Sequence, residues 1–263
     1  MLKKIFFAML VAVAVVCSAQ AGTVFMAYTN SSYETGSNWW PDGVLPTATQ
    51  TAEIRQSAVL GAPVTAPNAL WLGINQAASL TISGSGSFSA GGFAEYTRVG
   101  QVYSATLNLA NSSTMGSYTA GAVFISHSDS VAGITGTLNV TGGGLVDTGS
   151  FLVGAGLGTG VANIVNGGVR GYDMNIYNDA GASKIFIGEF GKLEFAYNSG
   201  NEAYGSNTLA AFNTWVASGR LVTSPGRTLQ YENIYGWGTI TSIPEPATML
   251  LLGIGGLLFR KRS

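Results

Sequence analysis

Two short sequence elements alternate through the middle of the chain, and their repetition restricts the fold more than any other feature. In the first element apolar and polar residues alternate ahead of a turn, and successive copies begin 27, 31, 24 and 31 residues apart. Its copies lie at residues 80–88, 107–115, 138–146, 162–169 and 193–195. The second element places an aliphatic residue before glycine or serine, at residues 71–73, 98–100, 124–126, 152–154 and 186–188. Such recurrence in a constant order indicates stacked copies of one structural unit.

The alternation predicts strands with one buried face. Leu107 and Leu109 fall on one side of such a strand and Asn108 on the other, because successive side chains point to opposite faces. One strand pair cannot bury an apolar face alone, whereas stacked copies bury it in a continuous core. We therefore expect an all-β chain built as a parallel β-solenoid (β-helix-like) over residues 71–205. The alternative is an antiparallel β-sandwich, whose strands also alternate between glycine turns.

Composition favours the same class. Glycine accounts for 37 of 263 residues, and each glycine disfavours a helix by about 1 kcal/mol relative to alanine. One short helix near the C-terminal end is expected at residues 207–217, capped by Ser206 or Asn207 and followed by Gly219. Its expected apolar stripe consists of Leu209, Phe212 and Trp215 or Val216.

The flanks of the repeats are expected to close the ends of the stack. Residues 22–70, with Trp39, Trp40 and Pro41, are predicted to form an N-terminal cap, although the two tryptophans could instead stack on sugar rings. Residues 206–243 are predicted to form a capping helix and terminal strands.

The N-terminal segment 1–21 has the pattern of a secretory signal peptide. Lys3 and Lys4 precede a short apolar run, and Ala19 and Ala21 supply the small residues that signal peptidase requires. Cys17, the one cysteine, lies within this segment, so the processed chain would contain no disulfide and no thiolate site.

The C-terminal segment 244–263 has three parts in a fixed order. Pro244, Glu245 and Pro246 come first, an apolar run at 247–259 follows, and Arg260, Lys261 and Arg262 precede the last residue. Thirteen helical residues span only about 20 Å, which is short for a bilayer core of about 30 Å. The basic cluster favours a transmembrane helix with the preceding chain outside, since positive flanks remain cytoplasmic.

These residues resemble the C-terminal tail of the PEP-CTERM proteins of Gram-negative bacteria. The resemblance covers residues 244–263 and implies that an exosortase recognises and cleaves this segment. It further implies transient anchoring in the inner membrane and then release or transfer to the cell surface or the extracellular space. The family is associated with exopolysaccharide and biofilm, which makes exopolysaccharide an expected partner beside exosortase and signal peptidase.

No arrangement of side chains in the sequence indicates catalysis, and we expect a protein that is not an enzyme, with no catalytic, metal-binding or cofactor-binding residues. His127, the one histidine, lies in a serine-rich run without a nucleophile elbow and is expected in a solvated loop. The carboxylates are scattered, Glu189 and Glu194 included. Between the two terminal segments, seven basic residues face twelve acidic ones, which excludes the basic stripe of a nucleic-acid-binding protein.

The expected function is that of an exported, exosortase-processed surface or extracellular-matrix protein with a structural or adhesive role. A carbohydrate-binding or ice-binding module is the alternative, and outward rows of Thr81, Thr106 and Thr137 would favour it. A β-helix polysaccharide lyase or glycosidase is a further alternative and would require acidic and basic side chains aligned across coils.

Overall fold

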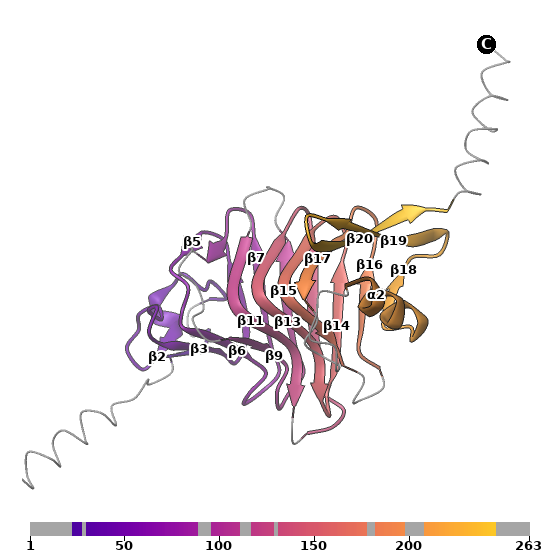
Figure 1. Cartoon of the computed structure of the whole chain (residues 1–263). Coiled ribbons are helices and arrows are strands. Elements are labelled where there is room, and N and C mark those ends of the chain that lie inside the picture. The colour runs from indigo at the N-terminus through magenta and orange to yellow at the C-terminus, as the bar shows by residue number, and fades with distance from the viewer. Residues whose placement is uncertain are drawn as a thin grey trace, which may run out of the picture.

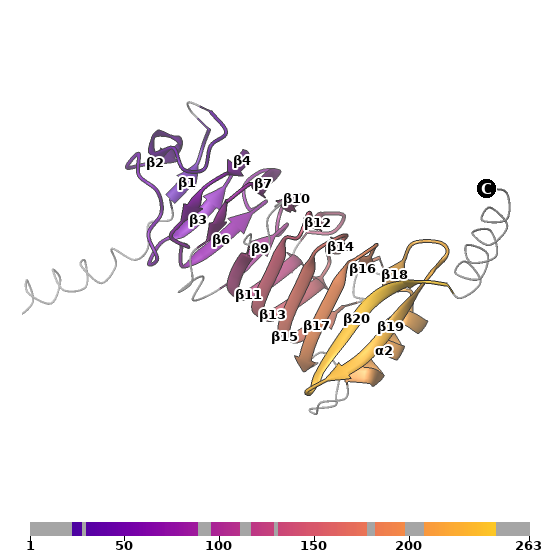
Figure 2. The same ribbon diagram turned by 90° about the horizontal axis from the view of Figure 1, so that it is seen from above.

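The structure, a computed structural model, describes residues 23–27, 30–88, 96–110, 117–128, 131–177, 182–197 and 208–245. These residues form an elongated stack of strands that advances along its axis in the order of the sequence (Figure 2). The predicted signal peptide and the apolar run of the tail lie outside the described residues.

Two sheets run the length of the stack, and we name them sheet A and sheet B. Within the described residues sheet A has 11 strands, in the order β19-β20-β17-β15-β13-β11-β9-β6-β3-β1-β2. Their bounds are β1 Thr23–Phe25, β2 Trp39–Trp40, β3 Thr51–Ile54, β6 Ala69–Leu72, β9 Thr97–Val99, β11 Ser117–Ser128, β13 Leu145–Gly156, β15 Gly168–Ile176, β17 Lys192–Tyr197, β19 Arg227–Ile234 and β20 Trp237–Pro244.

Sheet B has seven described strands, in the order β18-β16-β14-β12-β10-β7-β4. Their bounds are β4 Ser57–Leu60, β7 Ala78–Ser83, β10 Ala105–Ala110, β12 Thr135–Thr141, β14 Thr159–Ile164, β16 Lys184–Ile187 and β18 Leu221–Thr223. Two further short strands, β5 Pro63–Val64 and β8 Ser87–Phe88, pair with each other beside the stack.

All the ladders of sheet B are parallel, and this register aligns the apolar residues into the core. Leu107 pairs with Leu80 on one side and with Leu138 on the other, and all three are fully buried. In sheet A, Val99, Ile125 and Val153 align in the same way and are also fully buried. The expectation of a parallel β-solenoid is thereby confirmed, and the antiparallel sandwich is excluded.

The long strands of sheet A turn a corner midway. In β13 the buried residues are Val146 and Thr148 before Gly149 but Phe151 and Val153 after it, so the inward phase shifts by one residue. Figure 1 shows the resulting curvature of β11, β13 and β15. We call the part of sheet A that aligns with residues 145–148 of β13 limb 1, and the part that aligns with residues 150–156 limb 2.

An aromatic cluster closes the N-terminal end. Trp39 is 1% exposed and packs edge-on against Phe25 and Tyr33, with ring centroids 5.3 and 4.8 Å apart, while Trp40 is 56% exposed. Trp39 therefore belongs to the cap, and the two tryptophans do not form a joint sugar platform. The parallel ladders already include β3, which lies before the expected start of the repeats at residue 71, and β6, which includes that residue.

The helix α2 (Thr208–Ala217) and the antiparallel pair β19 and β20 close the C-terminal end (Figure 1). Trp215 is buried and lies 5.2 Å from Phe195, ring centroid to ring centroid. Of the expected apolar stripe, Leu209 and Val216 are 47% and 40% exposed. The stripe was therefore wrong at Leu209, and of the alternatives Trp215 and Val216 it is Trp215 that is buried, together with Thr208 and Ala211. Asn207 and Ser206, the expected caps, lie outside the described residues.

The last copies of the two sequence elements lie in the opposite sheets from the earlier copies. Residues 186–188 belong to β16 and its turn in sheet B, where Phe186 pairs with Asn163. Leu193 lies in β17 of sheet A and pairs with Val169. The true counterpart of Leu152 on the next coil is Asn175. The sequence pattern did not identify Asn175 as this counterpart, because Asn175 is polar and no glycine follows its strand.

Candidate functional site

Hydroxyl side chains form a row on the outer face of sheet B. Ser57 pairs with Ser79, Ser79 with Thr106, and Thr106 with Thr137, on four consecutive strands. Each of these residues alternates with a buried apolar residue, which is why the row faces outward. We call this row and its flanking residues Ser104 and Thr135 the hydroxyl face.

The hydroxyl face lines a shallow depression of about 350 Å³. Three alanines, Ala77, Ala78 and Ala105, complete its floor. Ser79 Oγ donates to Ser57 Oγ at 3.0 Å, and Ser104 Oγ accepts from the backbone N–H of Thr135 at 2.9 Å. Within the described part of the chain, no side chain or backbone group bonds the hydroxyls of Thr106 and Thr137. These two hydroxyls can therefore donate to and accept from a ligand.

A ladder of asparagine amides runs beside the hydroxyl face. Asn163 donates to Asn139 and Asn139 donates to Asn108, both at 2.8 Å, and Asn108 donates to Thr81 at 3.2 Å. Thr81 therefore faces outward like Thr106 but lies in the neighbouring row. Because the amides of this ladder bond one another, we assign them to the stability of the sheet.

Aromatic and cationic side chains gather on the outer face of limb 2. Trp71, Arg98 and Phe124 pair in register on three consecutive strands. The ring of Tyr96 lies 6.5 Å from that of Trp71, at an interplanar angle of 13°, and 6.1 Å from that of Phe124. The Arg98 guanidinium carbon lies 4.4 Å from the Tyr96 ring centroid. Together with His127, whose ring lies 5.0 Å from Phe124, these residues form what we call the aromatic patch.

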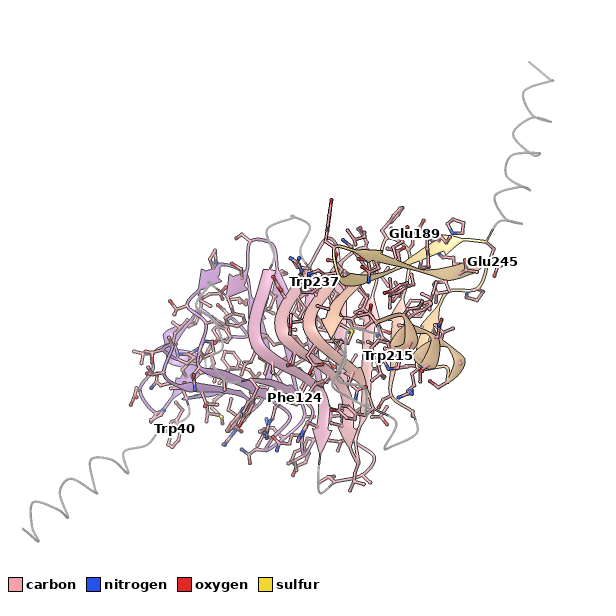
Figure 3. The ribbon with its side chains drawn as sticks, viewed as in Figure 1. Trp40, Phe124, Glu189, Trp215, Trp237 and Glu245 are labelled. Atoms are coloured by element: carbon pink, nitrogen blue, oxygen red, sulfur yellow. The ribbon has the colours of Figure 1, made fainter. Side chains whose placement is uncertain are left out.

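A second cation on an aromatic ring lies on limb 1. The Arg170 guanidinium carbon is 4.7 Å from the Trp237 ring centroid. In register, Arg170 lies between Asp147 and Glu194, so acidic residues flank it on both sides. Figure 3 shows Phe124 and Trp237 far apart on the stack, on different limbs of sheet A.

The structure corrects the expected place of His127. It belongs to β11, pairs with Ala155 and is half-buried beside Phe124, instead of lying in a solvated loop. The serine-rich run around it was misleading because Ser126 turns the strand through a positive φ of 60°, which places His127 on the outer face. Asp129, next to this run, lies outside the described residues.

The carboxylates are dispersed across the described structure. Glu194 pairs with Lys192 at 2.8 Å, while the exposed Glu189 carboxylate lies 3.7 Å from Arg227. Within the described residues no group of three His, Cys, Asp or Glu side chains could hold a metal ion. The absence of catalysis and of cofactors remains a prediction.

Two ionisable groups near the N-terminal cap have shifted pKa values. Burial alone would raise the pKa of Glu34, but hydrogen bonds from Ser32 Oγ and from the backbone N–H groups of Ala62 and Gly61 lower it below its ordinary value. The hydrogen bond between Arg55 and Glu53, at 2.8 Å, raises the pKa of the Arg55 guanidinium. Both groups therefore remain charged near neutral pH. Glu34 links its segment to residues 61–62, whereas the Arg55 guanidinium pairs with Glu53 two residues away in the sequence.

The first residues of the expected sorting signal are part of the fold. Pro244 ends β20 opposite Arg227, and the Glu245 backbone N–H donates to the Gly226 carbonyl at 3.0 Å. Figure 3 shows Glu245 at the end of the described ribbon. Pro244 continues the hairpin, because the carbonyl of a strand proline still pairs at a sheet edge.

The other predicted processing residues are not described by the structure. Pro246, Arg260, Lys261 and Arg262 lie outside the described residues, as do Ala19 and Ala21 of the predicted signal peptidase site. Among the helices that the structure describes, none is long and apolar enough to span a membrane. The C-terminal transmembrane helix and the signal peptide therefore remain predictions.

Sequence reasoning missed the aromatic patch and the asparagine ladder. The signal for the patch was present, because Trp71, Arg98 and Phe124 each stand first in a copy of the second repeated element. Asn108, Asn139 and Asn163 likewise occupy the same place in three copies of the first element. In both cases attention to the buried positions of the repeats left their outward positions unexamined.

Comparison with known proteins identifies the tail. Residues 242–263 match the family model described as the PEP-CTERM protein-sorting motif. The chain matches no curated protein and no solved structure. The motif confirms the resemblance of the tail and marks an exported protein that is targeted to exosortase and anchored through its C-terminal segment before processing.

Proposed function

We propose that this PEP-CTERM chain is an adhesive protein of the cell surface or extracellular matrix, and that its hydroxyl face binds exopolysaccharide. The observation that carries the proposal is the alignment of Ser57, Ser79, Thr106 and Thr137 in one outward row over a shallow depression. The role is one of binding and support, without catalysis.

The chemistry of the row suits a glycan. Each hydroxyl is both a donor and an acceptor, as are the hydroxyl groups of a sugar. Neighbouring strands lie about 4.8 Å apart, so a polysaccharide that follows the stack axis can contact hydroxyl groups on several strands of the row at once. Each contact is weak, but contacts repeated along one polymer raise its retention considerably.

The alternatives are less well supported by the same surface. An ice-binding module would need a flat, extended row, whereas this row lines a depression and ends where Val161 pairs with Thr137 and Lys184 follows it. A lyase or glycosidase would need a groove of acidic and basic residues, and the described lining of the depression consists of serine, threonine and alanine.

Co-sedimentation with an insoluble neutral polysaccharide tests the proposal. Protein recovered from cells that express the full chain is compared with a variant carrying Thr106→Val and Thr137→Val. We expect the double variant to lose binding at least about tenfold, since it removes two hydroxyl contacts while keeping side-chain shape. Thr228→Val, on exposed β19, is the matched control and should bind like the wild type.

Three results would contradict the proposal. The first is binding of the double variant at the wild-type level. The second is a loss of binding by the control equal to that of the double variant. The third is release of reducing ends from the polymer by the wild type. The last result would identify an enzyme.

A further inference from the structure

Four polar side-chain atoms are buried without hydrogen-bond partners on the outer face of limb 2. They are Trp71 Nε1, Arg98 Nε, Gln101 Oε1 and His127 Nδ1, and none of them has a partner within the described part of the chain. A buried polar atom that is left unpaired costs about 1–3 kcal/mol, so such atoms are uncommon in folded proteins. Because the four atoms lie in one region of the surface, they point to a ligand whose polar groups would form hydrogen bonds with them.

The ladder register brings these four atoms together. Trp71 and Arg98 are neighbours across β6 and β9, and Arg98 is the neighbour of Phe124 across β9 and β11. Gln101 lies two residues beyond Val99, as His127 lies two residues beyond Ile125, and Val99 pairs with Ile125. Trp71, Arg98 and His127 therefore lie on adjacent strands of sheet A, and Gln101 lies in the bend that follows β9. All four side chains are half-buried, so each retains contact with solvent.

Among the described residues, no carboxylate pairs with the positive charge of the patch, that of Arg98. The acidic residue in the same row, Glu53, is already bound by Arg55 at 2.8 Å and by the amide of Asn75. Arg170 likewise forms no ion pair within the described residues, but Asp147 and Glu194 are its neighbours in register, and the Glu194 carboxylate is bound by Lys192.

We propose that the aromatic patch is a second glycan site, specific for sugar residues that bear a carboxylate, such as those of a polyuronate. A planar carboxylate fits the two donors Arg98 Nε and Trp71 Nε1, because a guanidinium N–H prefers charged oxygen acceptors. The sugar hydroxyls donate to Gln101 Oε1 and His127 Nδ1. The apolar face of the sugar ring packs against Phe124, which is half-buried on the same row. This site differs from the hydroxyl face in both location and ligand charge.

Affinity electrophoresis of the protein recovered from expressing cells tests this assignment, with alginate as the polyuronate and dextran as the neutral polymer. Arg98→Gln removes the charge and leaves a shorter polar side chain. Arg170→Gln is the matched control, because it makes the same change at the other arginine that lies on an aromatic ring. Trp71→Phe removes the Nε1 donor and leaves a smaller aromatic ring. Circular dichroism identifies any variant that fails to fold.

The assignment predicts that alginate retards the wild type, that Arg98→Gln weakens the apparent affinity at least about tenfold, and that Trp71→Phe weakens it by a smaller factor. Arg170→Gln should remain within about twofold of the wild type, because Arg170 lies outside the aromatic patch and has the acidic residues Asp147 and Glu194 as neighbours in register. If Arg98→Gln does not fold, Trp71→Phe and Gln101→Leu test the site in its place, and both are expected to weaken the binding of alginate.

Three outcomes would overturn the assignment. In one, Arg170→Gln and Arg98→Gln weaken alginate binding equally, which indicates attraction by net charge alone. In another, poly-glutamate binds as tightly as alginate, which shows that the site recognises the carboxylates but not the sugar rings that carry them. In the third, alginate does not bind the wild type at all. The hydroxyl-face variants distinguish the two sites, since Thr106→Val with Thr137→Val should leave alginate binding intact.

Discussion

Ser126 and Gly154 occupy the same position on neighbouring coils, and both have a positive φ, of 60° and 75°. Each follows a buried strand residue, Ile125 or Val153, which pair with each other in sheet A. Gly73 and Gly100 fill this position on earlier coils with φ values of 76° and 80°. The coil therefore requires left-handed backbone at this corner, which explains why an aliphatic residue followed by glycine recurs in the sequence.

Replacing the two residues of this pair should have opposite effects on stability. Gly154→Ala should lower the free energy of unfolding by more than about 2 kcal/mol, because the new methyl group meets Ser183 Oγ and Cβ and because the backbone is left-handed. Ser126→Gly should leave it unchanged or raise it by up to about 1 kcal/mol, since it removes a strained φ and a buried hydroxyl without a partner. Urea unfolding measures both. Equal losses from the two variants would show that the corner does not require left-handed backbone.

The C-terminal cap should depend on a single side chain of α2. Trp215→Ala should lower the free energy of unfolding by about 3 kcal/mol, because it removes a buried ring that packs against Phe195. Leu209→Ala on the exposed face of the same helix should change it by less than about 0.5 kcal/mol. Thermal unfolding of the two variants provides the measurement. A larger loss from Leu209→Ala would mean that the helix packs through a different face.

The asparagine ladder should contribute stability without contributing to binding. Asn139 both donates to Asn108 and accepts from Asn163, so Asn139→Ala leaves two amides with unpaired groups and should cost about 1–2 kcal/mol. Thr137→Val, two residues away on the same strand, should change stability little but weaken binding to neutral polysaccharide. Denaturation and co-sedimentation of both variants separate the two effects. If Asn139→Ala weakened binding while leaving stability unchanged, the ladder would belong to the glycan site.

The stability of the N-terminal cap should depend on pH through Glu34. Because hydrogen bonds lower the pKa of this carboxyl in the folded state, the unfolded state binds more protons, and the contribution of Glu34 is present above its unfolded pKa and lost as the pH falls through the folded pKa. Glu34→Gln should therefore cost about 1 kcal/mol at pH 7 and nothing after Glu34 is protonated. Urea midpoints at pH 7 and pH 3 measure the difference, and Glu232→Gln on exposed β19 is the control. A cost that is the same at both pH values would show that the charge is irrelevant.

The stacking of the coils could be predicted because burial imposes a regular pattern on the sequence. Leu107 and Leu109 alternate with outward Asn108, and the same alternation recurs at the next coil. The sequence therefore predicts both the spacing of the coils and the side chains that face inward. The antiparallel pairing of β20 with β17 was not readable, because the local pattern of a strand does not reveal which neighbour its backbone bonds.

The surface sites were harder to foresee because they depend on which outward residues the register makes neighbours. Arg98 and Phe124 are 26 positions apart in the sequence but adjacent in the ladder. Insertions such as the one between Ser126 and Leu138 shift that register without altering the alternation. Thr106 and Thr137 were identified as an outward pair, whereas Thr81 was placed in their row although it belongs to that of the asparagines.

The identity of both ends of the exported protein tests the central claim most directly. The claim is that the sorting motif matched at residues 242–263 targets the chain to exosortase, which cleaves it near Pro244–Pro246 and leaves the solenoid outside the cell. Intact-mass spectrometry of protein from the extracellular and cell-surface fractions should find a chain that begins at Gly22 and lacks residues 247–263, and this form should disappear in cells without exosortase. Recovery of the chain through Ser263 from the same fractions, with and without exosortase, would contradict the account.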